Sequence, residues 1–185
     1  ILCRPFEFGA DIVIHSTTKY MDGHATSVGG VIIDSGKFDW KNGKFPSFTQ
    51  PDDSYHGVIY TEKFGELAYI TKARVQYVRD IGNPMTPMNA FLTNLGLETL
   101  HLRMERHSEN ALKVAQFLHD SDKVISVNYP GLPDDKYHSL AKKYLPKGCS
   151  GVVSFRIKGG KDAAVRFMDK LKLAAIVVHV ADART

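Results

Sequence analysis

The chain contains few of the features that mark secreted or membrane proteins. It has two cysteines among 185 residues, Cys3 and Cys149, and they form no C-x-x-C motif, so neither a disulfide framework nor a zinc site is indicated. No apolar run is long enough to cross a membrane, no signal-peptide pattern opens the chain, and no N-x-S/T site occurs. We therefore expect a cytoplasmic protein with no metal site and no membrane contact.

Charge of one sign is not concentrated anywhere in the sequence. The formal net charge is +4, but basic residues alternate with acidic ones, as in Lys161-Asp162 and Arg103-Met104-Glu105. No basic stripe interleaved with aromatic residues occurs, so a nucleic-acid partner is not expected. The content of 43% hydrophobic and 24% charged residues is typical of a globular protein.

The apolar pattern alternates between the periods of strands and helices, which predicts an α/β fold. Strands are expected at 11–16, 27–33, 124–127, 152–157 and 173–180. Helices are expected at 64–78, 88–119, 138–145 and 163–171, with a loop over 36–57. Gly96 is a candidate bend within the long helix, and Asp162 a candidate N-cap after a turn at Gly159-Gly160.

The most informative stretch is His15-Ser16-Thr17-Thr18-Lys19-Tyr20, at the end of a short apolar run. Residues i and i+2 of a strand project to the same side, so Ser16 and Thr18 can converge on one anion beside Lys19. A phosphate held by hydroxyls next to a lysine able to form an imine is typical of a pyridoxal-phosphate site. On this stretch alone, a strand end followed by a solvated lysine would be the more common interpretation.

Residues 11–24 closely resemble the cofactor-lysine signature of the Cys/Met-metabolism pyridoxal-phosphate enzymes. That family includes cystathionine synthases and lyases, methionine γ-lyase and O-acetylhomoserine sulfhydrylase. Further strings resemble later landmarks of the family in the same order: Arg79-Asp80-Ile81-Gly82, Thr86-Pro87-Met88-Asn89-Ala90-Phe91, Gly96-Leu97-Glu98-Thr99-Leu100 and Leu102-Arg103-Met104-Glu105-Arg106-His107. Several independent strings in register identify the chain as a member of this family.

The resemblance implies an α/β fold of the aspartate-aminotransferase type, the type I fold of pyridoxal-phosphate-dependent transferases. Residues 1–99 would form the end of the large cofactor-binding domain, and residues 100–185 most of the small C-terminal domain. Full-length members are more than twice this long, so we expect the second half of an enzyme that lacks its final segment.

The resemblance also implies roles for individual residues. Lys19 would bind pyridoxal 5'-phosphate and act as the general base, while the hydroxyls of Ser16 and Thr18 bind the cofactor phosphate. Tyr20 and His24 are expected to support the core or the turn. Ala25 stands where relatives usually have a small polar residue or glycine, and we expect it to be tolerated.

Other functional groups of the family are expected outside this chain. The aspartate that pairs with the pyridinium nitrogen lies well upstream of the lysine, and Asp11 is too close to be that residue. The ring-stacking tyrosine and a phosphate-binding arginine belong to the absent half, and Arg184 is not the arginine that binds the substrate carboxylate. We expect the chain on its own to be inactive.

Residues 45–57 resemble an insertion of the O-acetylhomoserine sulfhydrylases. This branch implies γ-replacement: O-acetylhomoserine reacts with sulfide or methanethiol to give homocysteine or methionine plus acetate. The family also implies a homo-oligomer, a tetramer of the full-length enzyme. Two alternatives stay open, a γ-lyase that releases a 2-oxo acid and ammonia, and a non-catalytic truncated remnant.

Overall fold

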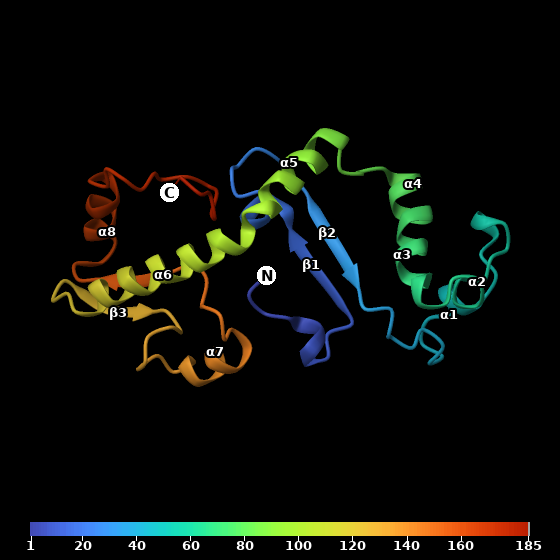
Figure 1. The fold of residues 1–185 in the computed structure, drawn as a ribbon, viewed down its shortest axis with the longest axis horizontal. Coiled ribbons are helices and arrows are strands. Elements are labelled where there is room, and N and C mark those ends of the chain that lie inside the picture. Colours follow the sequence, from blue (N-terminus) through green and yellow to red (C-terminus); the bar gives the residue numbers. More distant parts are fainter. Residues whose placement is uncertain (185) are drawn as a thin grey trace. The chain divides into compact units, whose positions relative to one another are not determined.

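The structure, a computed structural model, describes residues 1–184 (Figure 1). The chain folds as two compact units. The first, called here the lysine unit, comprises residues 1–4, 16–29 and 88–184. The second, called here the insertion unit, comprises residues 5–15 and 30–87. Lys19 therefore belongs to the unit that contains the C-terminal helices.

Two strands, β1 (Ile12–Ser16) and β2 (Gly30–Asp34), form a two-stranded sheet. They run in opposite directions (Figure 1), and the Ser35 N–H donates to the Asp11 carbonyl at 2.9 Å beyond their paired ends. The strand predicted at 11–16 is confirmed. The second begins at Gly30 rather than at residue 27, because residues 22–29 fold into a loop around a buried carboxylate, described below.

The insertion unit is built from short helices around aromatic side chains. These helices are α1 (Pro46–Thr49), α2 (Tyr60–Lys63), α3 (Ala68–Lys72) and α4 (Arg79–Ile81). A π-helical stretch over Ala73–Val78 joins α3 to α4, so this helical segment ends at Ile81 and not at residue 78. Phe48 and Tyr60 are buried together with Ala68, and Trp40 stacks on Phe48 at 4.4 Å between ring centroids. The predicted loop over 36–57 thus contains α1 and part of this core.

Asp52 connects the region of residues 45–57 to the helical segment that follows it. Its carboxylate accepts hydrogen bonds from the Tyr60 hydroxyl at 2.9 Å and the Gln76 amide at 2.6 Å. Lys72 Nζ lies 3.5 Å from the same carboxylate and 4.4 Å from the centre of the Tyr60 ring. Hydrogen bonds lower the pKa of Asp52 to about 2, and the largest contribution comes from the Ser54 hydroxyl. The carboxylate therefore stays charged at neutral pH and keeps its donors.

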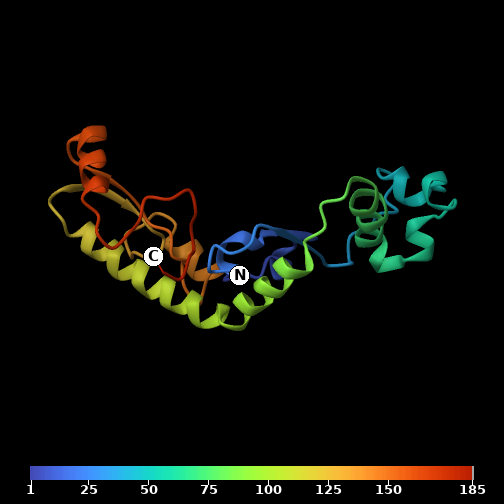
Figure 2. The same cartoon turned by 90° about the horizontal axis from the view of Figure 1, so that it is seen from above.

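The long helical stretch of the lysine unit is two helices, α5 (Pro87–Glu98) and α6 (Leu100–His119). Figure 2 shows the change of direction between them. The bend predicted at Gly96 is wrong: the helix breaks at Thr99, whose ψ is 1°. Gly96 stays helical, and its missing side chain serves a close packing contact instead.

The rest of the lysine unit is an α/β arrangement against α6. Its elements are β3 (Val124–Asn128), α7 (His138–Tyr144), β4 (Ser154–Ile157) and α8 (Gly160–Asp169). β3 and β4 pair antiparallel, with Val127 opposite Phe155. Ala111 and Ala115 of α6 pack with Tyr129 and Leu132 in the buried core. Across residues 1–184, no helix is both long enough and apolar enough to cross a membrane.

Two predictions near the C-terminus are wrong. No strand forms over 173–180, where Leu173 is 86% exposed, because β-branched residues make a strand only beside a partner that completes its hydrogen bonds. Asp162 is not the N-cap of α8. Gly159, with φ of 90°, takes that position, and Asp162 lies in the first turn.

Candidate active site

The chain turns sharply at the end of β1. Ser16 is the last extended residue, and Thr17–Met21 form a π-helical turn, called here the lysine turn. Lys19 leaves the helical conformation within it, at φ −94° and ψ −123°. The Gly23 N–H donates to the Lys19 carbonyl at 2.8 Å, and the Thr17 N–H to the Gly29 carbonyl at 2.9 Å. The lysine is thus displayed on a hydrogen-bonded turn and not on a strand.

The three hydroxyl residues before Lys19 have different environments. Ser16 is exposed, Thr17 is 3% exposed, and Thr18 is partly buried. Thr18 Oγ1 accepts from the Gly29 N–H at 3.0 Å and lies 3.4 Å from the Gly29 carbonyl. Thr17 Oγ1 is buried and has no partner. Because β1 ends at Ser16, the strand alternation that predicted convergence of Ser16 and Thr18 does not extend to Thr18.

The loop after the lysine turn is organised by Asp22, which is fully buried. Its carboxylate accepts hydrogen bonds from the Thr26 N–H at 2.9 Å, the Thr26 hydroxyl at 2.7 Å and the Ser27 hydroxyl at 3.2 Å. Burial acts to raise the pKa of Asp22, but the hydrogen bonds from Thr26, His24 and Ser27 outweigh it and lower the pKa. The loop therefore closes around a charged carboxylate.

Helix α5 packs against the lysine turn and the residue after it through a glycine. A Cβ atom on Gly96 would overlap the carbonyl oxygens of Met21 and Asp22. Only glycine allows the two backbones to approach this closely.

An arginine of α6 reaches the same turn. Arg103 Nη1 donates to the Tyr20 carbonyl at 2.7 Å, and Nη2 donates to the Gly96 carbonyl at 2.6 Å. A Cβ on Gly23 would run into this guanidinium, and Gly23 also has φ of 69°. The guanidinium thus joins the lysine turn to the end of α5.

Tyr20 and His24 support the turn, as the sequence predicted. The Tyr20 ring lies edge-on to His107 at 5.4 Å, and its hydroxyl accepts from the Gly151 N–H at 3.2 Å. His24 Nδ1 donates to the Asp22 carbonyl at 2.8 Å. The pKa of His107 is lowered, mainly because the ring is partly buried and to a smaller extent because of the Arg103 charge.

The C-terminal segment also contacts the loop after Lys19. The Ala183 N–H donates to the Gly23 carbonyl at 2.8 Å, and Arg184 Nη2 donates to the His24 carbonyl at 3.0 Å. Asp182 pairs with the Arg184 guanidinium at 2.7 Å. Backbone carbonyls after Lys19 are therefore bound both by α6 and by residues 183–184.

Sequence reasoning missed Asp22, Gly96 and Arg103. A lone aspartate, a glycine inside a helical pattern and an arginine on an amphipathic helix carry no local signal of these contacts. The hydrogen bond between Arg103 and Tyr20 spans 83 residues of sequence. Only the fold brings these residues to the lysine turn.

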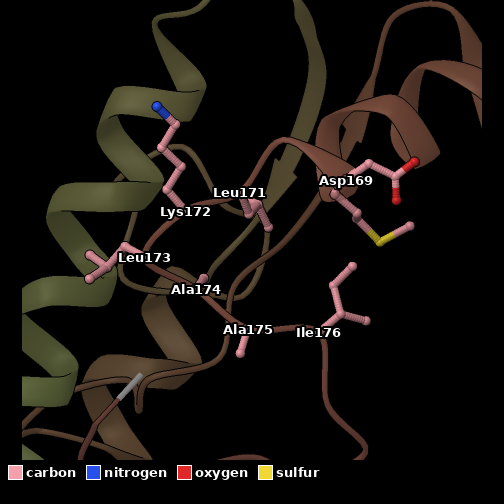
Figure 3. Close-up of a pocket in the computed structure, with 8 residues that line it drawn as sticks. Asp169, Leu171, Lys172, Leu173, Ala174, Ala175 and Ile176 are labelled. Atoms are coloured by element: carbon pink, nitrogen blue, oxygen red, sulfur yellow. The ribbon is translucent and has the colours of Figure 1, made fainter.

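A surface hollow of about 430 Å³ lies between the end of α8 and the segment after it, far along the chain from Lys19. Its lining is mostly aliphatic, and the side chains of Asp169 and Lys172 point in different directions (Figure 3). Polar groups do not converge there, so the hollow provides no catalytic arrangement. Within residues 1–184, no group of three or more His, Cys, Asp or Glu side chains could hold a metal ion.

The fold matches that of a solved enzyme. A crystal structure from Campylobacter jejuni, of a protein assigned as an O-acetylhomoserine (thiol)-lyase, superimposes with a TM-score of 0.90 at 36% identity, over 98% of this chain and 45% of that chain. That structure contains N'-pyridoxyl-lysine-5'-monophosphate. The fold is therefore the α/β fold of a pyridoxal-phosphate-dependent enzyme, as the sequence predicted.

Residues 1–185 match the family described as Cys/Met metabolism PLP-dependent enzyme, and the chain belongs to that family. It is 51% identical to O-acetyl-L-homoserine sulfhydrylase of Leptospira meyeri, over 100% of this chain and 44% of that protein. It is 50% identical to homocysteine synthase of Schizosaccharomyces pombe, over 100% of this chain and 43% of that protein. The predicted family is confirmed, and the chain spans less than half the length of these relatives.

Proposed function

We propose that Lys19 is the cofactor-binding lysine of the site, and that Ser16 and Thr18 hold the cofactor phosphate. The donor set fits pyridoxal phosphate, because it combines an amine for the aldehyde with hydroxyls for the phosphate. Ser16 is exposed at the end of β1. Among the ion pairs of residues 1–184, none involves Lys19, which leaves its amine available.

Thr18 fits the phosphate role through its hydrogen-bond geometry. Its Oγ1 accepts the Gly29 N–H at 3.0 Å, which fixes the oxygen, while the Gly29 carbonyl lies 3.4 Å away. That second contact is long for a hydroxyl donor. A phosphate oxygen is a stronger, charged acceptor, and it can accept the hydrogen bond of the Thr18 hydroxyl in place of the Gly29 carbonyl.

For the reaction, we propose γ-replacement on O-acetylhomoserine with sulfide or methanethiol, carried out by a longer protein that contains this chain. The observation that carries the proposal is the identity of 51% and 50% to proteins named O-acetyl-L-homoserine sulfhydrylase and homocysteine synthase. Both alignments include the whole of this chain, the lysine turn among it.

In this reaction the chain's own contribution is proton transfer by Lys19. Bound pyridoxal phosphate supplies an aldehyde that captures the substrate amine and a ring that withdraws electrons from it. The Lys19 amine takes the proton from Cα and then the proton from Cβ of the substrate. Acetate leaves from Cγ as the anion, the thiolate adds there, and the protons return to Cβ and Cα. The products are homocysteine or methionine, plus acetate.

The remaining parts of the proposal concern organisation. Residues 1–99 form the end of the large cofactor-binding domain, and residues 100–185 most of the small domain. The break of the helix at Thr99 supports a division at this point, although residues 16–29 and 88–98 fold in one compact unit with residues 100–184. We further propose a cytoplasmic homotetramer that acts on small molecules, as the family resemblance implies.

A substrate test separates this function from its alternative. The full-length protein is supplied with pyridoxal phosphate and O-acetylhomoserine, with and without sulfide. Homocysteine that forms only with sulfide supports γ-replacement. A 2-oxo acid and ammonia released at the same rate in both mixtures would show a γ-lyase, and no turnover in either would refute both.

A further inference from the structure

The Arg103 side chain reaches two backbone carbonyls of the lysine turn. Its Nη1 donates to the Tyr20 carbonyl at 2.7 Å, and its Nη2 lies 3.5 Å from the Met21 carbonyl. These are the two residues that follow Lys19. The carbonyl of Lys19 itself is bound by the Gly23 N–H at 2.8 Å. Three successive carbonyls, starting at Lys19, are therefore held in place.

The other side of the guanidinium is fixed by the α5–α6 junction. Arg103 Nε donates to the Thr99 hydroxyl at 3.0 Å, and Nη2 donates to the Gly96 carbonyl at 2.6 Å. The planar guanidinium thus joins the end of α5 to the end of the lysine turn. A lysine ammonium is a compact donor on a flexible stem and cannot match this spread of acceptors.

Arg103 differs in this from the next arginine of the same helix. Arg106 has a side chain that is 72% exposed and pairs with Glu109 at 3.6 Å, an interaction within α6. Exposed pairs of this kind contribute little to stability. Burial lowers the pKa of Arg103, and the Asp22 carboxylate acts against this shift. Arg103 binds the lysine turn, whereas the ion pair of Arg106 stays within α6. Substitutions of these two arginines on the same helix therefore form a matched pair for an experiment.

We propose that Arg103 is a positioning residue for Lys19. It fixes the backbone of the two residues that follow Lys19. It thereby sets the position of the Lys19 amine relative to the cofactor and the substrate. The inference rests on the proposed role of Lys19. Arg103 itself touches no reacting atom, so its effect is on the rates of Lys19 reactions and not on the affinity for the substrate.

The test compares Arg103→Ala, Arg103→Lys and Arg106→Ala in the full-length protein with saturating pyridoxal phosphate. We expect Arg103→Ala to lower kcat by about 10²-fold, the effect of misplacing a reacting group by about 1 Å, with little change in KM. The rate at which Lys19 becomes trapped as a pyridoxyl adduct by borohydride falls in parallel. Added guanidinium restores part of both rates in Arg103→Ala, and Arg106→Ala behaves as wild type.

A loss of kcat without guanidinium rescue, or an unchanged trapping rate at Lys19, would overturn the inference. Arg103→Lys is expected to lie between Ala and wild type. If Arg103→Ala does not fold, Thr99→Val decides, because it removes the acceptor of Nε and leaves Arg103 in place. It should lower kcat by about threefold, the scale of one hydrogen bond, and an unchanged kcat would refute the inference. Wild type without an adduct on Lys19 would refute the proposed function itself.

Discussion

Replacement of Gly96 by alanine sets two known effects against each other. In a helix interior, alanine is more stable than glycine by about 1 kcal/mol. Against this, the new Cβ would overlap the carbonyl oxygens of Met21 and Asp22. Overpacking costs about 1–3 kcal/mol, and we take the upper end because backbone oxygens cannot rotate away. The expected result is a net loss of about 2 kcal/mol in the local stability of the lysine turn.

Native-state hydrogen exchange of the full-length protein measures this loss directly. A decrease of about 2 kcal/mol corresponds to exchange that is about 30-fold faster in the peptide covering residues 17–24. Asn94→Ala is the control, because Asn94 is exposed on the same helix and alanine there adds no contact with the turn. Exchange in Gly96→Ala that equals or is slower than that of wild type would refute the close packing of α5 against the turn.

Three further predictions concern stability. Ala25 has φ of 54°, so Ala25→Gly should raise the free energy of unfolding by about 0.5–1 kcal/mol, and a lower thermal midpoint would contradict this. Tyr60→Phe removes a hydrogen bond to the Asp52 carboxylate and should cost about 1.5–3 kcal/mol in a thermal or urea unfolding assay, whereas an unchanged midpoint would show that Gln76 and Ser54 suffice. Hydrogen bonds to Asp120 and Asp134 raise the pKa of His119, so its contribution is present below its unfolded pKa of about 6.5 and is lost as the pH rises through the folded value. The thermal midpoint should therefore fall more between about pH 6 and pH 8 in wild type than in His119→Gln, and equal slopes would exclude His119 as the cause.

Local patterns in the sequence predicted much of the framework. The apolar run before Ser16 predicted β1, and the helical spacing after Pro87 predicted the residues of α5 and α6. The strand expected at 173–180 does not form, since its apolar residues have no neighbouring strand among the described residues. The period of the apolar residues indicates which face of an element can be buried. Whether a strand forms also depends on whether the rest of the chain places another strand beside it.

For the site too, the sequence predicts some residues and not others. The spacing of Ser16, Thr18 and Lys19 gave a chemical hypothesis without any structure. The supports of that turn could not be predicted, because Gly96 and Arg103 act through contacts with backbone atoms far away in sequence. The sequence predicts a bend at Gly96, but in the structure this glycine lets α5 approach the carbonyls of Met21 and Asp22.

The central claim is that Lys19 binds the cofactor, and peptide mapping tests it most directly. The full-length protein is loaded with pyridoxal phosphate, reduced with borohydride and digested, and the modified lysine is located by mass spectrometry. We predict a single pyridoxyl adduct on the peptide that contains Lys19, and none on it in Lys19→Ala. An adduct on another lysine of the active protein, or full activity in Lys19→Ala, would contradict the claim.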